Sequence, residues 1–120
     1  MNEPETIRTI LENVKTIAVI GLSNKPDRAS FGVSRYMQRH GYRIVPVNPS
    51  LSEVLDETSY PTLDAAAAAA GKIDLVDVFR APKFVPEIVN DVIRLKIPYL
   101  WLQQGVIDQQ SAQRAETAGV

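Results

Sequence analysis

The chain has 120 residues, a net charge of −1 and no cysteine, which suits one cytoplasmic globular domain over residues 1–120 and excludes disulfides, thiolate catalysis and thiolate metal sites. The balanced charge argues against a nucleic-acid binder, which usually carries a basic face. No apolar run approaches the roughly 20 residues that span a membrane, and the acidic, amphipathic start is unlike a signal peptide.

The first half of the chain alternates helix and strand patterns. Four apolar residues near the start have the spacing of a helix with one buried face: Ile7, Ile10, Leu11 and Val14. The apolar run over residues 16–20 predicts a strand buried on both faces, as in a parallel sheet. Residues 33–40 carry a second helical stripe, which Gly41 ends. Residues 42–49 predict the second strand, which Pro49 stops.

The third predicted strand carries acids within its apolar run. It spans residues 73–80 and follows a short helix over residues 62–70, where an alanine run favours helix before Gly71. Asp74 and Asp77 break the apolar pattern of this strand. We interpret the alternation as that of a strand at an edge of the sheet.

The remaining elements complete an alternating α/β pattern. Pro82 opens a helix, residues 99–105 predict a fourth strand, and Asp108 caps a last helix. Strands that alternate with helices over short connections form a parallel sheet through right-handed crossovers. We therefore predict a doubly wound, Rossmann-like parallel sheet with strand order 3-2-1-4, a switch point between strands 1 and 4, and a fifth strand beyond Val120.

The loop after the first strand, GLSNKPDRAS over residues 21–30, is suited to a phosphate. Gly21 lacks a Cβ, so a phosphate can approach its main chain. The loop leads into a helix N-terminus, where unpaired N–H groups and the helix dipole favour an anion. Hydrogen-bond donors and cations stand along the loop: Ser23, Asn24, Lys25, Arg28 and Ser30.

The glycine spacing excludes the two commonest phosphate motifs. The loop lacks the Gly-Lys-Ser/Thr end of a Walker loop, and Ser23 and Pro26 replace the second and third glycines of the dinucleotide fingerprint. Asn48 follows the second strand, where NAD-binding proteins place an acid for the ribose. Arg80 and Lys83, after the third strand, add more positive charge than one diphosphate needs. These features favour a phosphorylated, adenosine-like ligand such as coenzyme A over a nicotinamide dinucleotide.

Four stretches in this order resemble the family of small, single-domain CoA-binding proteins: IAVIGLSNKPDRASFGVSRYMQRHGYRIVPVNP, YPTLDA, IDLVDVFRAP and WLQQGV. The resemblance runs from about Thr6 to Val120. The family has a Rossmann-like fold and is similar to the CoA-binding domain of the succinyl-CoA synthetase α subunit. The resemblance implies coenzyme A as the cofactor, with CoA or an acyl-CoA as the small-molecule ligand.

The resemblance also implies which residues contact the cofactor. The loop after the first strand would receive the phosphates, the residues after the second and third strands would lie beside the nucleotide, and those after the fourth would lie near the diphosphate or the start of the pantetheine arm. The implied cofactor-binding residues are Gly21, Leu22, Ser23, Asn24, Lys25, Arg28, Asn48, Phe79, Arg80, Gln103 and Gln104.

No catalytic or metal-binding set is recognised in the sequence. The single histidine, His40, falls near the end of a helix, at the edge of the sheet away from the predicted site, and no predicted site loop offers the paired acids of acid–base catalysis. The sequence therefore favours a CoA or acyl-CoA binding module without catalytic machinery of its own. The alternative is a nucleotide-dependent enzyme subunit, oxidoreductase-like or CoA ligase-like, that needs a partner chain. A homo-oligomer is compatible with the sequence.

Overall fold

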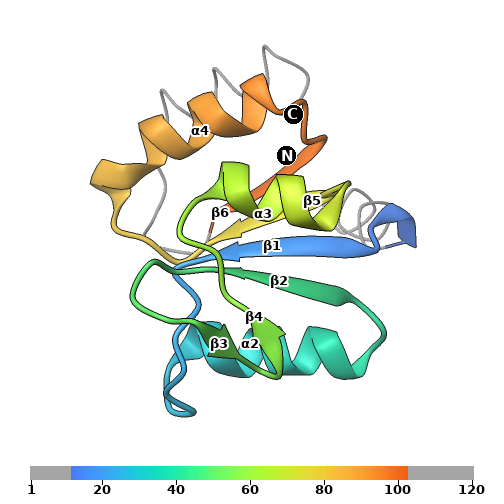
Figure 1. The fold of residues 1–120 in the computed structure, drawn as a ribbon, viewed down its shortest axis with the longest axis vertical. Helices are drawn as coiled ribbons and strands as arrows, with labels where there is room; N and C mark the ends of the chain where they lie inside the picture. Colours follow the sequence, from blue (N-terminus) through green and yellow to red (C-terminus); the bar gives the residue numbers. More distant parts are fainter. Residues whose placement is uncertain (1–11, 103–120) are drawn as a thin grey trace.

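The fold is seen over residues 12–102, the part of the chain that the computed structural model describes (Figure 1). In chain order its elements are β1 (Thr16–Ile20), α2 (Ala29–Arg39), β2 (Arg43–Val47), β3 (Glu53–Val54), β4 (Glu57–Thr58), α3 (Leu63–Ala70), β5 (Leu75–Val78), the 3-10 helix η1 (Pro82–Phe84), α4 (Val85–Arg94) and β6 (Tyr99–Leu102). The predicted strands and helices of this range are confirmed. Most of the predicted first helix, the last helix and the fifth strand lie outside the described residues. None of the described helices is long and apolar enough to cross a membrane.

The parallel sheet has four strands in the order β2-β1-β5-β6. Its register pairs Ile17 of β1 with Ile44 of β2 on one side and with Leu75 of β5 on the other. The predicted strand order 3-2-1-4 is therefore wrong, because the third predicted strand, β5, lies between β1 and β6. The chain reverses its direction of winding after β2, so the switch point falls between β1 and β5.

The two acids near the start of β5 and within it do not mark an edge strand. Asp74 is 8% exposed, and its Oδ2 accepts hydrogen bonds from the main-chain N–H groups of Lys15 and Thr16, both at 3.0 Å. Asp77 is 3% exposed in a strand with neighbours on both sides. The edge-strand interpretation failed because main-chain donors can satisfy a buried carboxylate, and the apolar pattern does not reveal those donors.

Helices cover both faces of the sheet. In Figure 1, α2 lies on one face, and α3 and α4 lie on the other. Alternate residues of β1 point to opposite faces of the sheet. Ile17 and Val19 belong to the core cluster on the α2 side. Ala18 and Ile20 belong to the cluster under α3 and α4. This arrangement confirms the strand buried on both faces that the continuous apolar run predicts.

A short hairpin between β2 and α3 is absent from the sequence prediction. Its strands β3 and β4 pair antiparallel, and Leu55 and Asp56 between them have φ values of 55° and 62°. After the hairpin, Tyr60 forms a parallel bridge with Val47, and its N–H donates to the carbonyl oxygen of Pro46 at 3.0 Å. This segment brings the start of α3 beside the carboxyl end of β2.

Candidate functional site

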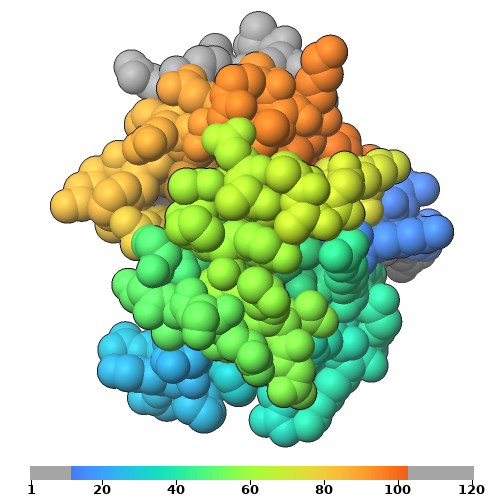
Figure 2. Space-filling model, in the orientation of Figure 1, coloured from blue at the N-terminus to red at the C-terminus, as the bar shows by residue number. Residues whose placement is uncertain are grey.

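Two pockets meet at the carboxyl ends of β1, β2 and β5, on the side toward which the arrows of β1 and β2 point in Figure 1. The first, called the loop pocket, has a volume of about 420 Å³ and is lined by Gly21, Ser23, Lys25, Arg28, Ala29, Ser30 and Phe79. The second, called the helix pocket, has a volume of about 220 Å³ and lies between the start of α3 and α4; its lining includes Gly21, Asn48, Thr62, Arg80, Phe84, Glu87 and Asp91. In Figure 2 the loop after β1, in light blue, and the start of α4, in yellow-orange, both project from this side.

Gly21 lies where the two pockets join, and its backbone has a φ of +84°. Its N–H donates to the carbonyl oxygen of Val47 at 2.9 Å. A Cβ at this position would come within 2.5 Å of the Phe79 carbonyl oxygen and 3.2 Å of Cδ of Arg80. Glycine is therefore required by the close passage of the loop after β5, in addition to the predicted approach of a phosphate.

The loop after β1 is folded by its own hydroxyl groups. The N–H of Ser23 donates to Oγ of Ser30 at 3.0 Å, and the N–H of Lys25 donates to Oγ of Ser23 at 3.1 Å. Both hydroxyls accept in these bonds, so each keeps its proton for a further acceptor. α2 then begins at Ala29 without a side-chain cap and without an acid in its first turn. The loop pocket thus offers hydroxyl donors and a helix N-terminus, the chemistry that suits an anion.

Asn48 connects the loop after β2 to the loop after β1. Its Nδ2 donates to the carbonyl oxygen of Leu22 at 3.0 Å, and its Oδ1 accepts from the N–H of Ser50 at 2.9 Å. The Leu22 side chain is fully buried in the core on the α2 side. Leu22, predicted to contact the cofactor, is therefore a core residue that lines neither pocket, and Asn48 holds its main-chain carbonyl oxygen.

The loop after β5 brings a cation over an aromatic ring. The guanidinium carbon of Arg80 lies 3.9 Å from the ring centroid of Phe84, and Nζ of Lys83 lies 5.2 Å from the same centroid. Such stacking holds a guanidinium in place and leaves its edge free to donate. Arg80 and Phe84 both line the helix pocket, while the preceding Phe79 lines the loop pocket and packs against the core on the α2 side.

The structure brings most of the predicted ligand-binding residues together. Seven of them line one of the two pockets: Gly21, Ser23, Lys25, Arg28, Asn48, Phe79 and Arg80. Asn24 is exposed and is not among the residues that line either pocket. Gln103 and Gln104 follow the last residue of β6 in the sequence and lie outside the described residues.

Sequence reasoning missed the residues that the start of α3, the 3-10 helix η1 and α4 contribute to the helix pocket: the N-cap Thr62, Phe84 of η1, and Glu87 and Asp91 of α4. The predicted strand order gave no reason to expect these two helices on one face beside the site. Only the observed strand order, in which the chain crosses from β2 over β1 to β5, places α3 and α4 on the same face.

The single histidine lies away from both pockets. His40 follows the last residue of α2, whose first residue is at the site. Its ring stacks on Tyr36 with 4.1 Å between centroids, and its Nδ1 lies 2.8 Å from the Tyr36 carbonyl oxygen. Over residues 12–102, no three His, Asp or Glu side chains are grouped so as to hold a metal ion.

The winding of the parallel sheet defines a Rossmann-like α/β domain. A family model described as a CoA-binding domain matches residues 15–120. The chain therefore belongs to the CoA-binding domain family, which confirms the resemblance found in the four sequence stretches.

The chain is also similar to individual proteins. An uncharacterized Bacillus subtilis protein, YneT, is 38% identical over 113 residues, which cover 94% of this chain and 82% of YneT. The α subunit of acetate–CoA ligase (ADP-forming) I from Pyrococcus furiosus is 26% identical over 84 residues, which cover 68% of this chain and 18% of the subunit. The solved structure of a hypothetical protein from Pyrococcus horikoshii superposes with a TM-score of 0.89 at 36% identity, covering 97% of this chain and 80% of that one.

Proposed function

We propose that the protein binds coenzyme A or an acyl-CoA across the two pockets and acts as a binding module. The observation that carries the proposal is the junction at Gly21 of an anion-suited loop pocket with a partly apolar helix pocket. CoA has the same two-part character, since a charged diphosphate joins an adenosine to a long, mostly uncharged arm. Membership of the CoA-binding domain family supports this ligand class.

We assign the diphosphate to the loop pocket. There, Lys25 and Arg28 supply positive charge, and Ser23 and Ser30 supply hydroxyl donors at the start of α2. Ser30 is 5% exposed, so its Oγ is held in one place by the fold. A preformed set of donors binds an anion with little loss of side-chain entropy.

We assign the adenosine to the helix pocket. Apolar side chains such as Ile20, Leu63 and Ile88 line it together with the Phe84 ring, and a base can stack on such surfaces. Arg80 reaches the junction of the pockets, where it can pair with a phosphate of the nucleotide. We further propose that the pantetheine arm extends toward the carboxyl end of β6, the strand beside β5 in the sheet; the predicted residues Gln103 and Gln104 come next in the sequence.

A binding role is favoured over catalysis by the way the site acids are used. Glu87 and Asp91 both line the helix pocket, but Asp91 is held by Arg94 at 2.9 Å. An oxygen of this carboxylate already accepts a hydrogen bond from Arg94, which leaves less of it free to take a proton from a ligand. The ligase subunit from Pyrococcus furiosus is matched over only 18% of its length, and we do not extend the activity in its name to this chain.

Calorimetric titration with CoA, acetyl-CoA, NAD and NADP tests the proposal. We expect CoA or acetyl-CoA to bind and to raise the melting temperature, because a ligand of the folded state stabilises it by mass action. We expect NAD to bind more weakly, since Asn48 stands where an acid would hold its ribose. Equal affinities for NAD and CoA, or no binding of either CoA species, contradict the proposal. Mass spectrometry of ligand released from the denatured protein identifies the acyl group.

A further inference from the structure

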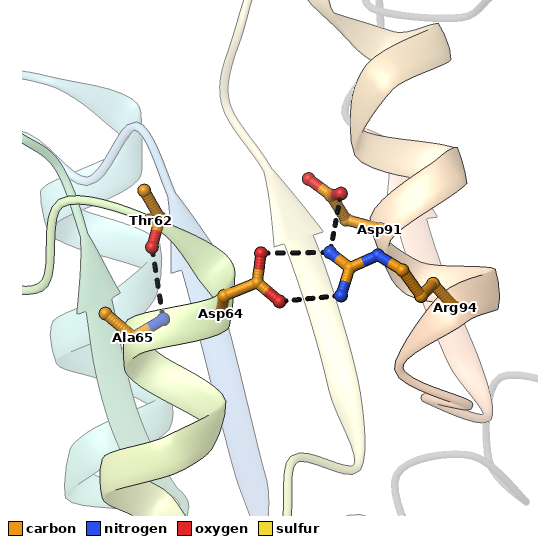
Figure 3. Close-up of polar contacts among 5 residues, drawn as sticks. All are labelled: Thr62, Asp64, Ala65, Asp91 and Arg94. Carbon is orange, nitrogen blue, oxygen red and sulfur yellow. Dashed lines mark hydrogen bonds and ion pairs between the residues drawn. The ribbon is translucent and has the colours of Figure 1, made fainter.

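The side chain of Arg94 joins α3 to α4 at the wall of the helix pocket (Figure 3). Its Nη1 donates to Oδ1 of Asp64 at 2.8 Å and its Nη2 donates to Oδ2 of Asp64 at 2.9 Å, so the guanidinium meets this carboxylate with two parallel bonds. Nη2 also donates to Oδ1 of Asp91 at 2.9 Å. One cation therefore holds two carboxylates from different helices.

This ion network borders the helix pocket directly. Asp91 lines the pocket, and Asp64 follows Leu63, which lines it at the start of α3. An isolated pair of exposed side chains contributes little, but two-pronged arginine–carboxylate geometry within a network is the exception. The hydrogen bond from Arg94 holds the pKa of Asp64 below its usual value. Asp64 stands in the first turn of α3 and Arg94 in the last turn of α4, where each charge complements its helix dipole.

The state of Asp91 determines how much negative charge the pocket presents. Glu87 and Asp91 are the acids of the lining, and Arg80 is its cation. Under the proposed function, the adenosine part of CoA carries a 3′-phosphate into this pocket. A second unpaired carboxylate would repel that phosphate over a short distance and through a partly apolar medium, where charges interact more strongly than in water.

We propose that Arg94 is a positioning residue of the CoA site. It offsets the charge of Asp91, so the helix pocket presents one carboxylate fewer to the phosphorylated nucleotide. Arg94 itself need not touch the ligand, since it acts through Asp91. This inference rests on the proposed function and adds to it the control of charge in the helix pocket.

Adenosine 3′,5′-bisphosphate is the probe for the test, because it carries the nucleotide end of CoA without the pantetheine arm. Its affinity and that of CoA are measured by calorimetry at low and high salt for the wild type, Arg94→Gln, Arg94→Lys and the double variant Arg94→Gln with Asp91→Asn. Arg39→Gln is the matched control, since Arg39 is an exposed arginine in the last turn of α2, far from the pockets. Thermal melts establish that each variant is folded.

We expect Arg94→Gln to weaken both ligands about fivefold at low salt, with a smaller loss at high salt because the ions screen the charge of Asp91. We expect Arg94→Lys to lose less, and the double variant to return to within about twofold of the wild type, since the two changes act on one coupled pair. Arg39→Gln should bind as the wild type does.

Three outcomes overturn the inference. If Arg94→Gln binds as tightly as the wild type, Arg94 does not control the pocket. If removal of the Asp91 charge fails to restore binding, Arg94 has a structural role only. If the wild type binds neither ligand, the proposed function fails and this inference fails with it. Failure of the inference alone gives a different result: the wild type binds, and Arg94→Gln binds equally well.

Discussion

The loop pocket and the helix pocket share Gly21 but are built from the chain in different ways. Apart from Phe79, the lining of the loop pocket comes from residues 21–30, whereas the helix pocket draws on β1, β2, the start of α3, the loop after β5 and α4. The loop pocket presents the cations Lys25 and Arg28, while the helix pocket balances a cation against acids. The difference teaches that the pocket proposed for the diphosphate is made almost entirely from one loop, whereas the pocket proposed for the adenosine needs several elements brought together.

Replacement of Gly21 should break both pockets and have the largest effect on binding. In Gly21→Val, a Cβ meets the Phe79 carbonyl oxygen at 2.5 Å at a φ of +84°. A β-branched residue in this backbone region is strained by roughly 1–3 kcal/mol before the collision is counted. We expect a loss of CoA binding and a lower free energy of unfolding, measured by urea denaturation.

Gly32→Ala is the matched control for that variant. Gly32 lies within α2, and a Cβ there meets nothing within 4 Å. Alanine in a helix interior is more favourable than glycine by roughly 0.5–1 kcal/mol, so this variant should be as stable as the wild type or more so. A Gly21→Val protein with wild-type stability would show that the loop after β5 can move away from β1.

Arg80→Ala tests the contribution of the helix pocket to CoA affinity, because Arg80 lines that pocket and not the loop pocket. Loss of a charge-assisted contact typically costs about 1.5–3 kcal/mol, which corresponds to a tenfold to hundredfold weaker affinity. We expect this loss for CoA and a smaller loss for 3′-dephospho-CoA, which carries less charge into the helix pocket. Calorimetry with both ligands on both proteins gives the comparison. Equal losses of affinity for the two ligands would show that Arg80 contacts the diphosphate and not the 3′-phosphate.

Ser30→Ala probes the loop pocket alone and should have a moderate effect. The change removes the acceptor of the Ser23 N–H and one hydroxyl donor, at a cost of about 1 kcal/mol for one neutral hydrogen bond or roughly fivefold in affinity for CoA. Ser34→Ala, one turn along α2, is the control. The buried Oγ of Ser34 has no hydrogen-bond partner among the described residues, so its removal should leave binding unchanged. Similar losses in both variants would assign the effect to α2 as a whole.

Asp74→Asn touches neither pocket and should have the smallest effect on binding, although it changes stability. Burial tends to raise the pKa of Asp74, but the N–H groups of Thr16 and Lys15 and the charge of Lys72 outweigh it, so the pKa lies below its usual value. A carboxyl of lowered pKa stabilises the fold above its unfolded-state pKa, and this contribution disappears as the pH falls through the folded-state pKa. We expect Asp74→Asn to lower stability at neutral pH and to flatten its decline in acid, measured by denaturation against pH. If Asp74→Asn loses stability in acid as steeply as the wild type does, Asp74 is not the source of that decline.

The sequence alone determined the fold class and the strands and helices other than the β3–β4 hairpin, and it predicted most residues of the loop pocket. These features depend on residues close together in the chain: a continuous apolar run for β1, an alanine run for α3, and a glycine followed by donors and cations before α2. The same local patterns carried the resemblance to CoA-binding proteins. Local signals suffice here because a strand, a helix and a phosphate-suited loop each form from short-range main-chain geometry and periodicity.

Only the tertiary structure decided the strand order, the helix pocket and the role of the acids. Periodicity shows that a strand is buried but does not name its neighbours, so the place of β5 beside β1 could not be inferred from its residues. Asp74 suggests an edge until the N–H groups of Lys15 and Thr16, almost 60 residues away, are seen to hold it. The contact of Arg94 with Asp64 also joins residues far apart in the chain. Such contacts depend on how elements pack, and packing is a property of the whole fold rather than of any one segment.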